Sequence, residues 1–389
     1  MEPERRESRD PTAGIAARAT PFELLFDLVF VFTITQVTHV VTHEPDAVGI
    51  YRAVVLLALV YCIYDGYIWL MNQAPPAGAV TRVVLLVAMA GFLIVAVAIP
   101  TAFEDGQWTF SITLLAVILI HHVLFVVVGS PANAVGILRT GPFNLVAAII
   151  LVASGLIGGS GAAWLFPLAL AVILASVLSN RRGGFDLRAS HLIERHGLLM
   201  IIAFGESIVT VGATLTTQSL DLSSLTAASL IVGVVGGLWW TYFFTGDLAR
   251  TEQRVQERDA TRRGTLAITA FYGDHLGMMI GLVLFAAGSG LSVGEADHGH
   301  GVDAGTLAGI GVAIFFFSQA LYRVELRLGH AASRLIGGLV AVAIGIWSVL
   351  IDPLTELALL LTTVAGVVAW APLLSALSKR RSQARQPTS

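Results

Sequence analysis

The sequence predicts an all-α, polytopic transmembrane helical bundle with about twelve spans. Of its 389 residues, 56% are hydrophobic and only 13% are charged, against about 25% charged in a soluble domain. The apolar stretches continue for about 20 residues without two-residue alternation, which favours spanning helices over a barrel. Arginines and acids also occupy alternate connections between these stretches, as expected for a chain that crosses a bilayer repeatedly.

The first half of the chain, 20–182, follows a polar N-terminal segment, 1–19. It contains six apolar stretches, each long enough for one crossing at about 20 residues per span. They are expected at 22–43, 49–71, 80–101, 107–129, 140–159 and 162–180. The connection at 158–161 is so short that the last two helices could instead form a re-entrant pair.

The second half, 183–378, precedes a basic tail, 379–389, and has the same organisation. Its six spans are expected at 190–213, 223–246, 265–288, 305–327, 332–351 and 355–377. The connection at 351–353 is also very short. If one of the two tight pairs is re-entrant, the count falls to ten spans.

The charged residues of the connections predict the orientation, because short arginine-rich loops stay in the cytoplasm. Numbered from an inside N-terminus, the inside segments carry the arginines, and the outside loops carry acids. The arginines include Arg82, Arg139, Arg188, Arg250, Arg254, Arg258, Arg262, Arg263, Arg327 and Arg334, and the acids include Glu44, Asp46, Glu104, Asp105, Asp221, Glu295, Asp297, Asp303 and Asp352. We therefore expect a multi-pass protein of the bacterial inner (plasma) membrane with both termini in the cytoplasm.

Similar stretches recur about halfway along the chain. A segment that starts at Glu23 opens the first span, and a segment that starts at Glu194 opens the seventh. Aromatic residues end the second span at Tyr67 and Trp69, and the eighth span at Trp239. Six spans per half would orient both halves the same way, as parallel repeats with a substrate path between them. Chance similarity among apolar helices is the alternative.

Three ionisable residues are expected near the middle of the membrane. Glu206 lies 12 residues beyond Glu194, which is about 18 Å along a helix, and Asp274 and His275 lie about ten residues into the ninth span. An ionisable group at this depth costs about 2.5–3.5 kcal/mol to insert, so it requires a partner, water or a function. We interpret the three as a transport or proton path in which Glu206 pairs with Asp274 or His275. A structural, hydrogen-bonded role is the alternative.

A second group of charged residues is expected at the inner ends of the first and seventh spans. Glu23 and Asp27 are four residues apart and share a helix face. Asp27 lies a turn deeper in the membrane and requires a counter-charge, for which Arg195 and Arg323 are the candidates. Glu194 opens the seventh span, where the helix dipole also favours an acid. We include the three acids in the predicted path.

Further polar residues are expected to support this path. They are Ser207, Gln319, His122 and Asp65. No spacing of histidine, cysteine and carboxylates matches a metal or haem site, and no nucleotide or hydrolase motif occurs in the sequence. We therefore predict no metal, no cofactor and, from a net charge of −3, no nucleic-acid partner.

Two segments resemble a known family. Residues 23–32, which read ELLFDLVFVF, and the segment from Glu194 to Val209, which contains ERHGL and GESIV, are similar to the signatures of the bacterial low temperature requirement protein A family. The resemblance covers about 20–380, nearly the whole chain. It implies a multi-pass inner-membrane protein and draws attention to Glu23, Asp27, Glu194 and Glu206. It implies no substrate.

These observations favour a secondary transporter coupled to protons or another cation, with a small ion or small molecule as substrate. An ion channel is one alternative, and a membrane-embedded enzyme that acts on a lipidic substrate is another. An enzyme is favoured less, because no catalytic motif is found. We expect the protein to be surrounded by the lipid bilayer, and a homo-oligomer is compatible with this architecture.

Overall fold

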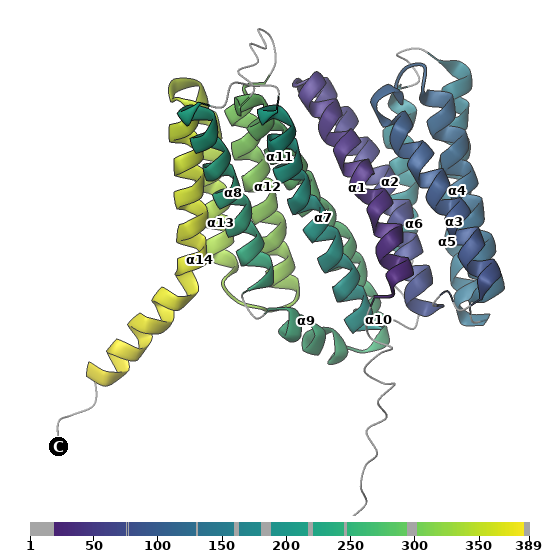
Figure 1. Ribbon diagram of the computed structural model, residues 1–389. Helices are drawn as coiled ribbons and strands as arrows, with labels where there is room; N and C mark the ends of the chain where they lie inside the picture. The colour runs from purple at the N-terminus through teal and green to yellow at the C-terminus, as the bar shows by residue number, and fades with distance from the viewer. Residues whose placement is uncertain are drawn as a thin grey trace, which may run out of the picture.

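The computed structural model describes residues 19–74, 76, 78–129, 131–158, 163–179, 188–216, 221–244, 247–293 and 302–384. Within these ranges the chain is helical and contains no strand. The helices form a side-by-side bundle, with the first half of the chain on one side and the second half on the other (Figure 1). The predicted all-α polytopic bundle is therefore confirmed.

The first half supplies six long helices and one short 3₁₀ turn. They are α1 (Pro21–His43), α2 (Ala47–Gln73), α3 (Ala79–Ala98), η1 (Ile99–Thr101), α4 (Gln107–Val128), α5 (Pro131–Ile157) and α6 (Leu165–Ser179). The start of α1 is fixed by a capping box, in which the Thr20 hydroxyl accepts from the Glu23 N–H and the Glu23 carboxylate accepts from the Thr20 N–H.

The second half contains helices at all six expected spans and one helix that was not expected. The elements are α7 (Ala189–Leu215), α8 (Leu222–Phe243), α9 (Asp247–Gln256), α10 (Ala260–Leu266), η4 (Ala267–Asp274), α11 (His275–Val293), α12 (Ala304–Glu325), α13 (Ala331–Trp347), η5 (Ser348–Leu350) and α14 (Pro353–Ala384). The unexpected helix is α9, a short charged segment in a connection predicted as a loop. The element η4 is a π-helix that joins α10 to α11.

The helix lengths agree with a membrane location. In the described part of the chain, 11 helices are long and apolar enough to cross a bilayer, and α6 contains a shorter apolar stretch, Leu165–Val177. Large apolar side chains such as Leu28, Val80 and Leu339 are exposed on the outside of the bundle, at 61%, 78% and 63%. Surface of this kind is unfavourable in water and suits contact with lipid.

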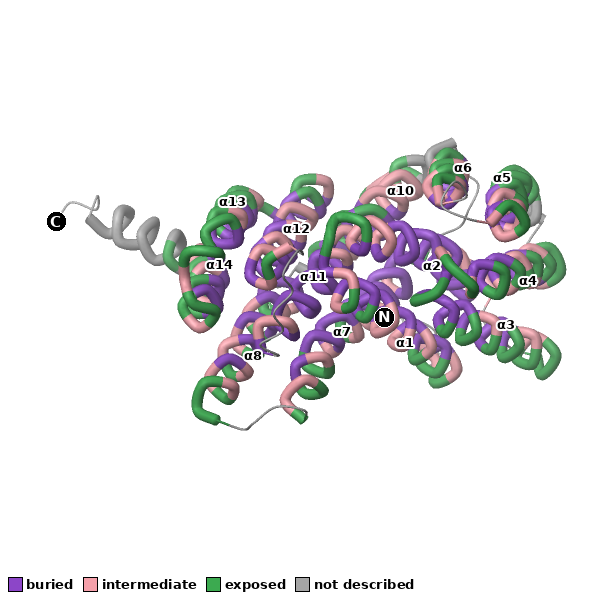
Figure 2. The backbone as a smooth tube through the Cα atoms, turned by 90° about the horizontal axis from the view of Figure 1, so that it is seen from above, coloured by how far each residue is buried: buried purple, intermediate pink, exposed green. Residues whose placement is uncertain are grey.

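The two halves meet along α1 and α7. Seen from above, these helices are neighbours, and α2 and α11 lie beside them in the most buried part of the bundle (Figure 2). Both α1 and α7 begin at the same end of the bundle (Figure 1). The charged side chains of Glu23, Asp27 and Arg195 on this interface are buried, and the candidate site lies here.

Close packing of α11 on α12 depends on glycine. A Cβ atom on Gly281 would lie 2.6 Å from both the Gly311 carbonyl oxygen and the Phe315 backbone nitrogen. These are backbone atoms, so a rotamer change cannot relieve the clash. Small residues at such positions let membrane helices approach closely.

We therefore expect Gly281→Ala to destabilise the bundle by about 1–3 kcal/mol, the usual cost of overpacking. The measurement is the unfolding midpoint of the purified protein in detergent. Gly236→Ala in α8 is the matched control, because a Cβ there meets no atom within 4 Å. Equal midpoints for the two variants would contradict the role given to Gly281.

Candidate functional site

A buried pair of acid–base contacts joins α1 to α7. The Glu23 carboxylate lies 2.9 Å from His191 Nε2. One turn further, Arg195 donates two hydrogen bonds to the Asp27 carboxylate, at 2.7 and 2.5 Å. Both contacts join residues 168 positions apart, so the two helices are parallel and in register here. Four-residue spacing on each helix places both acids on one face and both bases on the opposing face.

The Asp27 carboxylate is buried and accepts hydrogen bonds from two residues, Arg195 and Tyr64. Arg195 is fully buried and Asp27 is 3% exposed, and the Tyr64 hydroxyl of α2 donates a third hydrogen bond to the same carboxylate. Arg195 is thus the counter-charge of Asp27, as predicted. The alternative prediction, that Arg323 is the counter-charge of Asp27, was wrong. The Arg323 guanidinium donates to the backbone carbonyls of Gly329 and Leu328, at 2.7 and 3.5 Å.

A second polar line runs from α2 across α7 to α11 and α8. Asp65 Oδ1 lies 3.1 Å from His196 Nε2, and the rings of His196 and His275 are 5.0 Å apart. His275 Nε2 in turn lies 2.7 Å from the Tyr242 hydroxyl. Both histidines, Asp65 and Tyr242 are buried.

Backbone contacts assign the tautomers in this line. His275 Nδ1 lies 2.8 Å from the Ala270 carbonyl, and His196 Nδ1 lies 2.9 Å from the Leu192 carbonyl. A carbonyl only accepts, so each Nδ1 carries a proton. A neutral His196 would then present a second acceptor to the Asp65 carboxylate. His196 Nε2 and Asp65 Oδ1 thus face each other at 3.1 Å as a buried acid–base contact, and neither atom has a hydrogen-bond partner within the described residues.

The π-helix η4 lies between the His275 end of this polar line and a cavity that Asp65 also lines. Its backbone pattern leaves the Phe271 carbonyl to accept a hydrogen bond from the Tyr61 hydroxyl, at 2.9 Å. Ile268 and Tyr272 line the cavity, whereas the Phe271 ring stacks on His275. Single π-turns inside helices occur frequently at functional sites.

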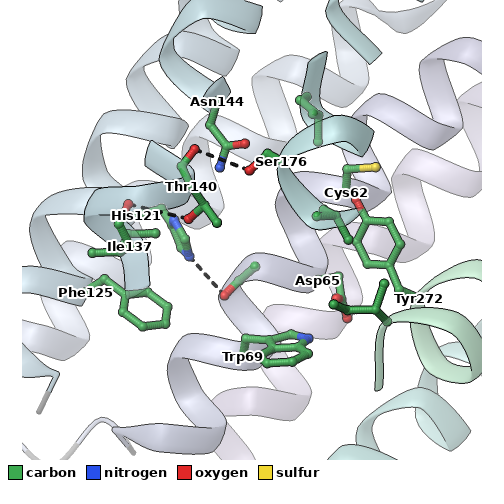
Figure 3. A pocket seen from close by; sticks show the side chains of 14 residues that line it. Cys62, Asp65, Trp69, His121, Phe125, Ile137, Thr140, Asn144, Ser176 and Tyr272 are labelled. Carbon is green, nitrogen blue, oxygen red and sulfur yellow. Dashed lines mark hydrogen bonds between the residues drawn. The ribbon is translucent and has the colours of Figure 1, made fainter. Parts of the chain in front are cut away.

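The cavity has a volume of about 110 Å³ and lies between α2, α4, α5, α6 and the start of the α10–α11 span. Figure 3 shows Asp65, Trp69 and Tyr272 on one side of it and His121, Thr140 and Asn144 on the other. Because all these residues lie in the halves of their helices next to the arginine-rich connections, the cavity belongs to that end of the bundle.

A second cavity lies at the opposite end of α1 and α2. Its volume is about 260 Å³, and its walls include the stacked rings of His39 and His43 and the ion pair between Arg52 and Glu44. Among the described residues, cavities thus lie toward both ends of α1 and α2.

Glu206 does not have the partners that the sequence predicted. Its carboxylate accepts hydrogen bonds from the hydroxyls of Thr35, at 2.7 Å, and Thr210, at 2.9 Å. The expected pairing with Asp274 or His275 was wrong. His275 lies at the level of His196, and Glu206 follows His196 by ten residues, or about 15 Å of helix.

Other predicted residues have local roles. Glu194 accepts from the Ala19 N–H at 3.0 Å, at the same end of the bundle as Glu23. Gln319 accepts from Arg334 Nε at 3.1 Å and donates to the Thr241 hydroxyl. His122 Nδ1 lies 2.6 Å from the Ile118 carbonyl. These residues do not join the polar line.

Asp274 and Ser207 differ from the residues that have local partners. Both are buried, and neither Asp274 Oδ2 nor Ser207 Oγ has a hydrogen-bond partner within the described residues. Neither residue joins the contacts that surround Glu206 or Asp65. Their inclusion in the path stays a prediction.

Several residues of the site were not predicted from the sequence. His191 carried a signal, since it precedes Arg195 by four residues and so shares its helix face. Tyr64, Tyr242 and Thr35 carried none, because a hydroxyl on an apolar helix is common and its partner is set by tertiary packing.

Comparison with known proteins assigns the chain to a family. The model of the bacterial low temperature requirement A protein (LtrA) matches residues 18–371. A curated protein of Rhizobium meliloti (strain 1021), described as uncharacterized, is 25% identical over 348 residues, which is 83% of this chain and 80% of that protein. No solved structure matches. Since the family model covers nearly all of the bundle, including both cavities and the α1–α7 contacts, the chain belongs to the bacterial low temperature requirement A protein family and is a multi-pass membrane protein in contact with lipid.

Proposed function

We propose that this membrane protein is a secondary transporter coupled to protons or another cation. The observation that carries the proposal is the buried contact between the Asp65 carboxylate and the His196 imidazole, which borders a cavity. The Asp65 carboxylate lines the cavity and also faces the imidazole. A carboxylate that takes up a proton from this imidazole and also contacts an occupant of the cavity would link the two events, which is the condition for coupling.

The surrounding contacts support the same function. Buried ionisable residues in membrane helices are costly and usually mark ion or proton pathways. Here such residues form two connected groups on the interface between the halves, and a cavity lies toward each end of the bundle. An arrangement of halves around a central polar path is common in transporters. The two halves, 20–182 and 183–378, are proposed to be parallel repeats, which the common level of Glu23 and Glu194 supports.

The test is flux in proteoliposomes that contain a pH-sensitive dye. A gradient of substrate cation, taken from a panel, is expected to drive saturable proton movement that is absent from protein-free liposomes. Asp65→Asn should lose the proton movement, because the remaining amide cannot take up the proton. A channel would instead give non-saturable current without coupling, and an enzyme would form product without any gradient.

The orientation is a separate prediction. We propose an inner-membrane location with both termini in the cytoplasm, because of the arginine-rich connections. Reporter fusions at Arg254, in α9, and at Ser389 should behave as cytoplasmic, and a fusion at Asp297 as external. An external signal from Arg254 would reverse the assignment. It would also place the cavity at the external face.

A further inference from the structure

We propose that the cavity beside Asp65 binds a small neutral carboxamide, a solute with N–H donors and a carbonyl acceptor at one end and a short hydrocarbon group at the other. The proposal goes beyond the proposed function, because it concerns what the cavity binds and not which ion crosses the membrane. Three features of the lining lead to it: an unpartnered buried hydroxyl, a mixture of donors and acceptors, and an acid that already faces an imidazole.

The unpartnered hydroxyl belongs to Tyr272 of the π-helix η4. Tyr272 is 5% exposed and lines the cavity, and Figure 3 shows its ring reaching toward Cys62. The hydroxyl lies beside the Cys62 thiol, a weak hydrogen-bonding group, and has no hydrogen-bond partner within the described residues. A buried hydroxyl without a partner is unfavourable, so an occupant that bonds to it stabilises the cavity.

The other polar groups of the lining include both donors and acceptors. The side-chain amide of Asn144 offers two N–H donors and a carbonyl acceptor. His121 Nε2 lies 3.0 Å from the Gly66 carbonyl, so Nε2 carries the proton and Nδ1 is an acceptor. Asp65 adds a carboxylate. An occupant that matches this lining needs both N–H donors and an acceptor, which a primary carboxamide combines in one planar group.

The charges around the cavity favour a neutral occupant. Asp65 is the acid among the lining residues, and its Oδ1 atom already faces His196 Nε2 at 3.1 Å. No lysine or arginine lines the cavity in the part of the chain that the structure describes. A cation would therefore compete with the imidazole for the carboxylate, and an anion would be repelled by it. A neutral solute leaves the acid–base contact intact.

The apolar wall and the volume set the size of the occupant. Ile137, Ile173 and Val177 contribute apolar surface, which stabilises a short hydrocarbon group. The volume of about 110 Å³ is well above the roughly 10–15 Å³ that one water requires and below the roughly 300–1,000 Å³ of pockets for drug-sized ligands. The occupant is therefore a carboxamide with few heavy atoms, such as propionamide.

The experiment is a titration of the detergent-purified full-length protein with propionamide, followed by saturation-transfer NMR of the ligand. This method detects the weak, millimolar binding expected of so small a molecule. We expect a saturable signal that protein-free micelles do not give. The same titration gives the dissociation constant of each variant described below.

Ligands of nearly the same shape separate hydrogen bonding from apolar partition. 2-Butanone replaces the amide nitrogen by a methyl group and lacks donors, so it should bind about 2- to 10-fold more weakly, the range expected for one lost hydrogen bond. Propionate and propylammonium carry a charge that the cavity does not compensate, and each should bind at least about tenfold more weakly than propionamide.

Two variants test the residues that carry the proposal. Tyr272→Phe removes only the unpartnered hydroxyl, so the protein should fold at least as well and bind propionamide about 2- to 10-fold more weakly. Asn144→Leu keeps the approximate size and should weaken binding to a similar degree. Tyr51→Phe is the matched control, because the Tyr51 hydroxyl is also buried without a partner within the described residues but does not line this cavity. It should bind propionamide with unchanged affinity.

The outcomes of this test do not depend on transport, because binding in detergent needs no membrane and no gradient. Coupled flux without propionamide binding would overturn this proposal and leave the transporter standing, whereas binding without flux would do the reverse. Lack of saturable binding, equal binding of 2-butanone or of either ion, or unchanged affinity in both Tyr272→Phe and Asn144→Leu would overturn the proposal.

Discussion

Replacement of Asp27 by alanine is expected to lower the stability of the bundle by about 3–5 kcal/mol, the usual cost of removing one partner of a buried ion pair. Arg195 is fully buried and donates two hydrogen bonds to this carboxylate, and Tyr64 donates a third. Alanine would leave the guanidinium uncompensated. The measurement is the free energy of unfolding in detergent, together with the yield of monodisperse protein.

The exposed ion pair of the same molecule supplies the control. Arg52 and Glu44 are 2.7 Å apart, but their side chains are 27% and 41% exposed. Glu44→Ala should therefore cost no more than about 1 kcal/mol. If Asp27→Ala yields no folded protein, Asp27→Asn and Arg195→Gln, singly and together, provide a double-mutant cycle. Additive effects of these two changes would contradict a direct coupling between the residues.

The spans were predictable from the sequence because the bilayer fixes their length. Each apolar stretch of about 20 residues corresponds to a helix, and the described helices agree with the expected spans. The helix α9 was not predictable in this way, since it is charged and does not cross the membrane. It is held by tertiary contacts, such as the hydrogen bond between Thr251 and Tyr322 at 3.2 Å.

The α1–α7 contacts were predictable in part. Four-residue spacing showed that Glu23 and Asp27 share a face, and burial of Asp27 required a cation, for which Arg195 was a candidate. The register of α1 against α7 could not be predicted from the sequence. That register pairs Glu23 with His191 and Asp27 with Arg195, and it depends on how α1 packs against α7.

The predicted pairing of Glu206 with Asp274 or His275 was wrong for a similar reason. Counting residues from the helix start placed Glu206 and His275 at comparable depths, yet helices begin at different levels. The ring contact between His196 and His275 shows that His275 lies ten residues of α7 away from Glu206. The cavity beside Asp65 was unpredictable for a stronger reason, because five separate segments of the chain form its walls.

Glu206→Gln is expected to abolish proton-coupled flux while the protein keeps its stability. The amide can accept a hydrogen bond from one threonine and donate to the other, so both Thr35 and Thr210 retain a partner. The amide cannot exchange a proton, whereas Glu206→Asp can, and Asp should retain part of the flux. The measurements are the unfolding midpoint and the rate of proton movement in proteoliposomes.

Two comparisons make this prediction specific to the α1–α7 interface. Glu356 is another buried acid, 3% exposed, but it lies on α14 close to Gly305 of α12 and away from α1. Glu356→Gln should therefore leave coupled flux unchanged. A purely structural Glu206 predicts the reverse order of the two Glu206 variants, because Gln preserves the hydrogen bonds and Asp, being shorter by one methylene, loses reach to Thr35. Full flux in Glu206→Gln, at normal stability, would remove Glu206 from the path and leave the Asp65–His196 contact as the proton site.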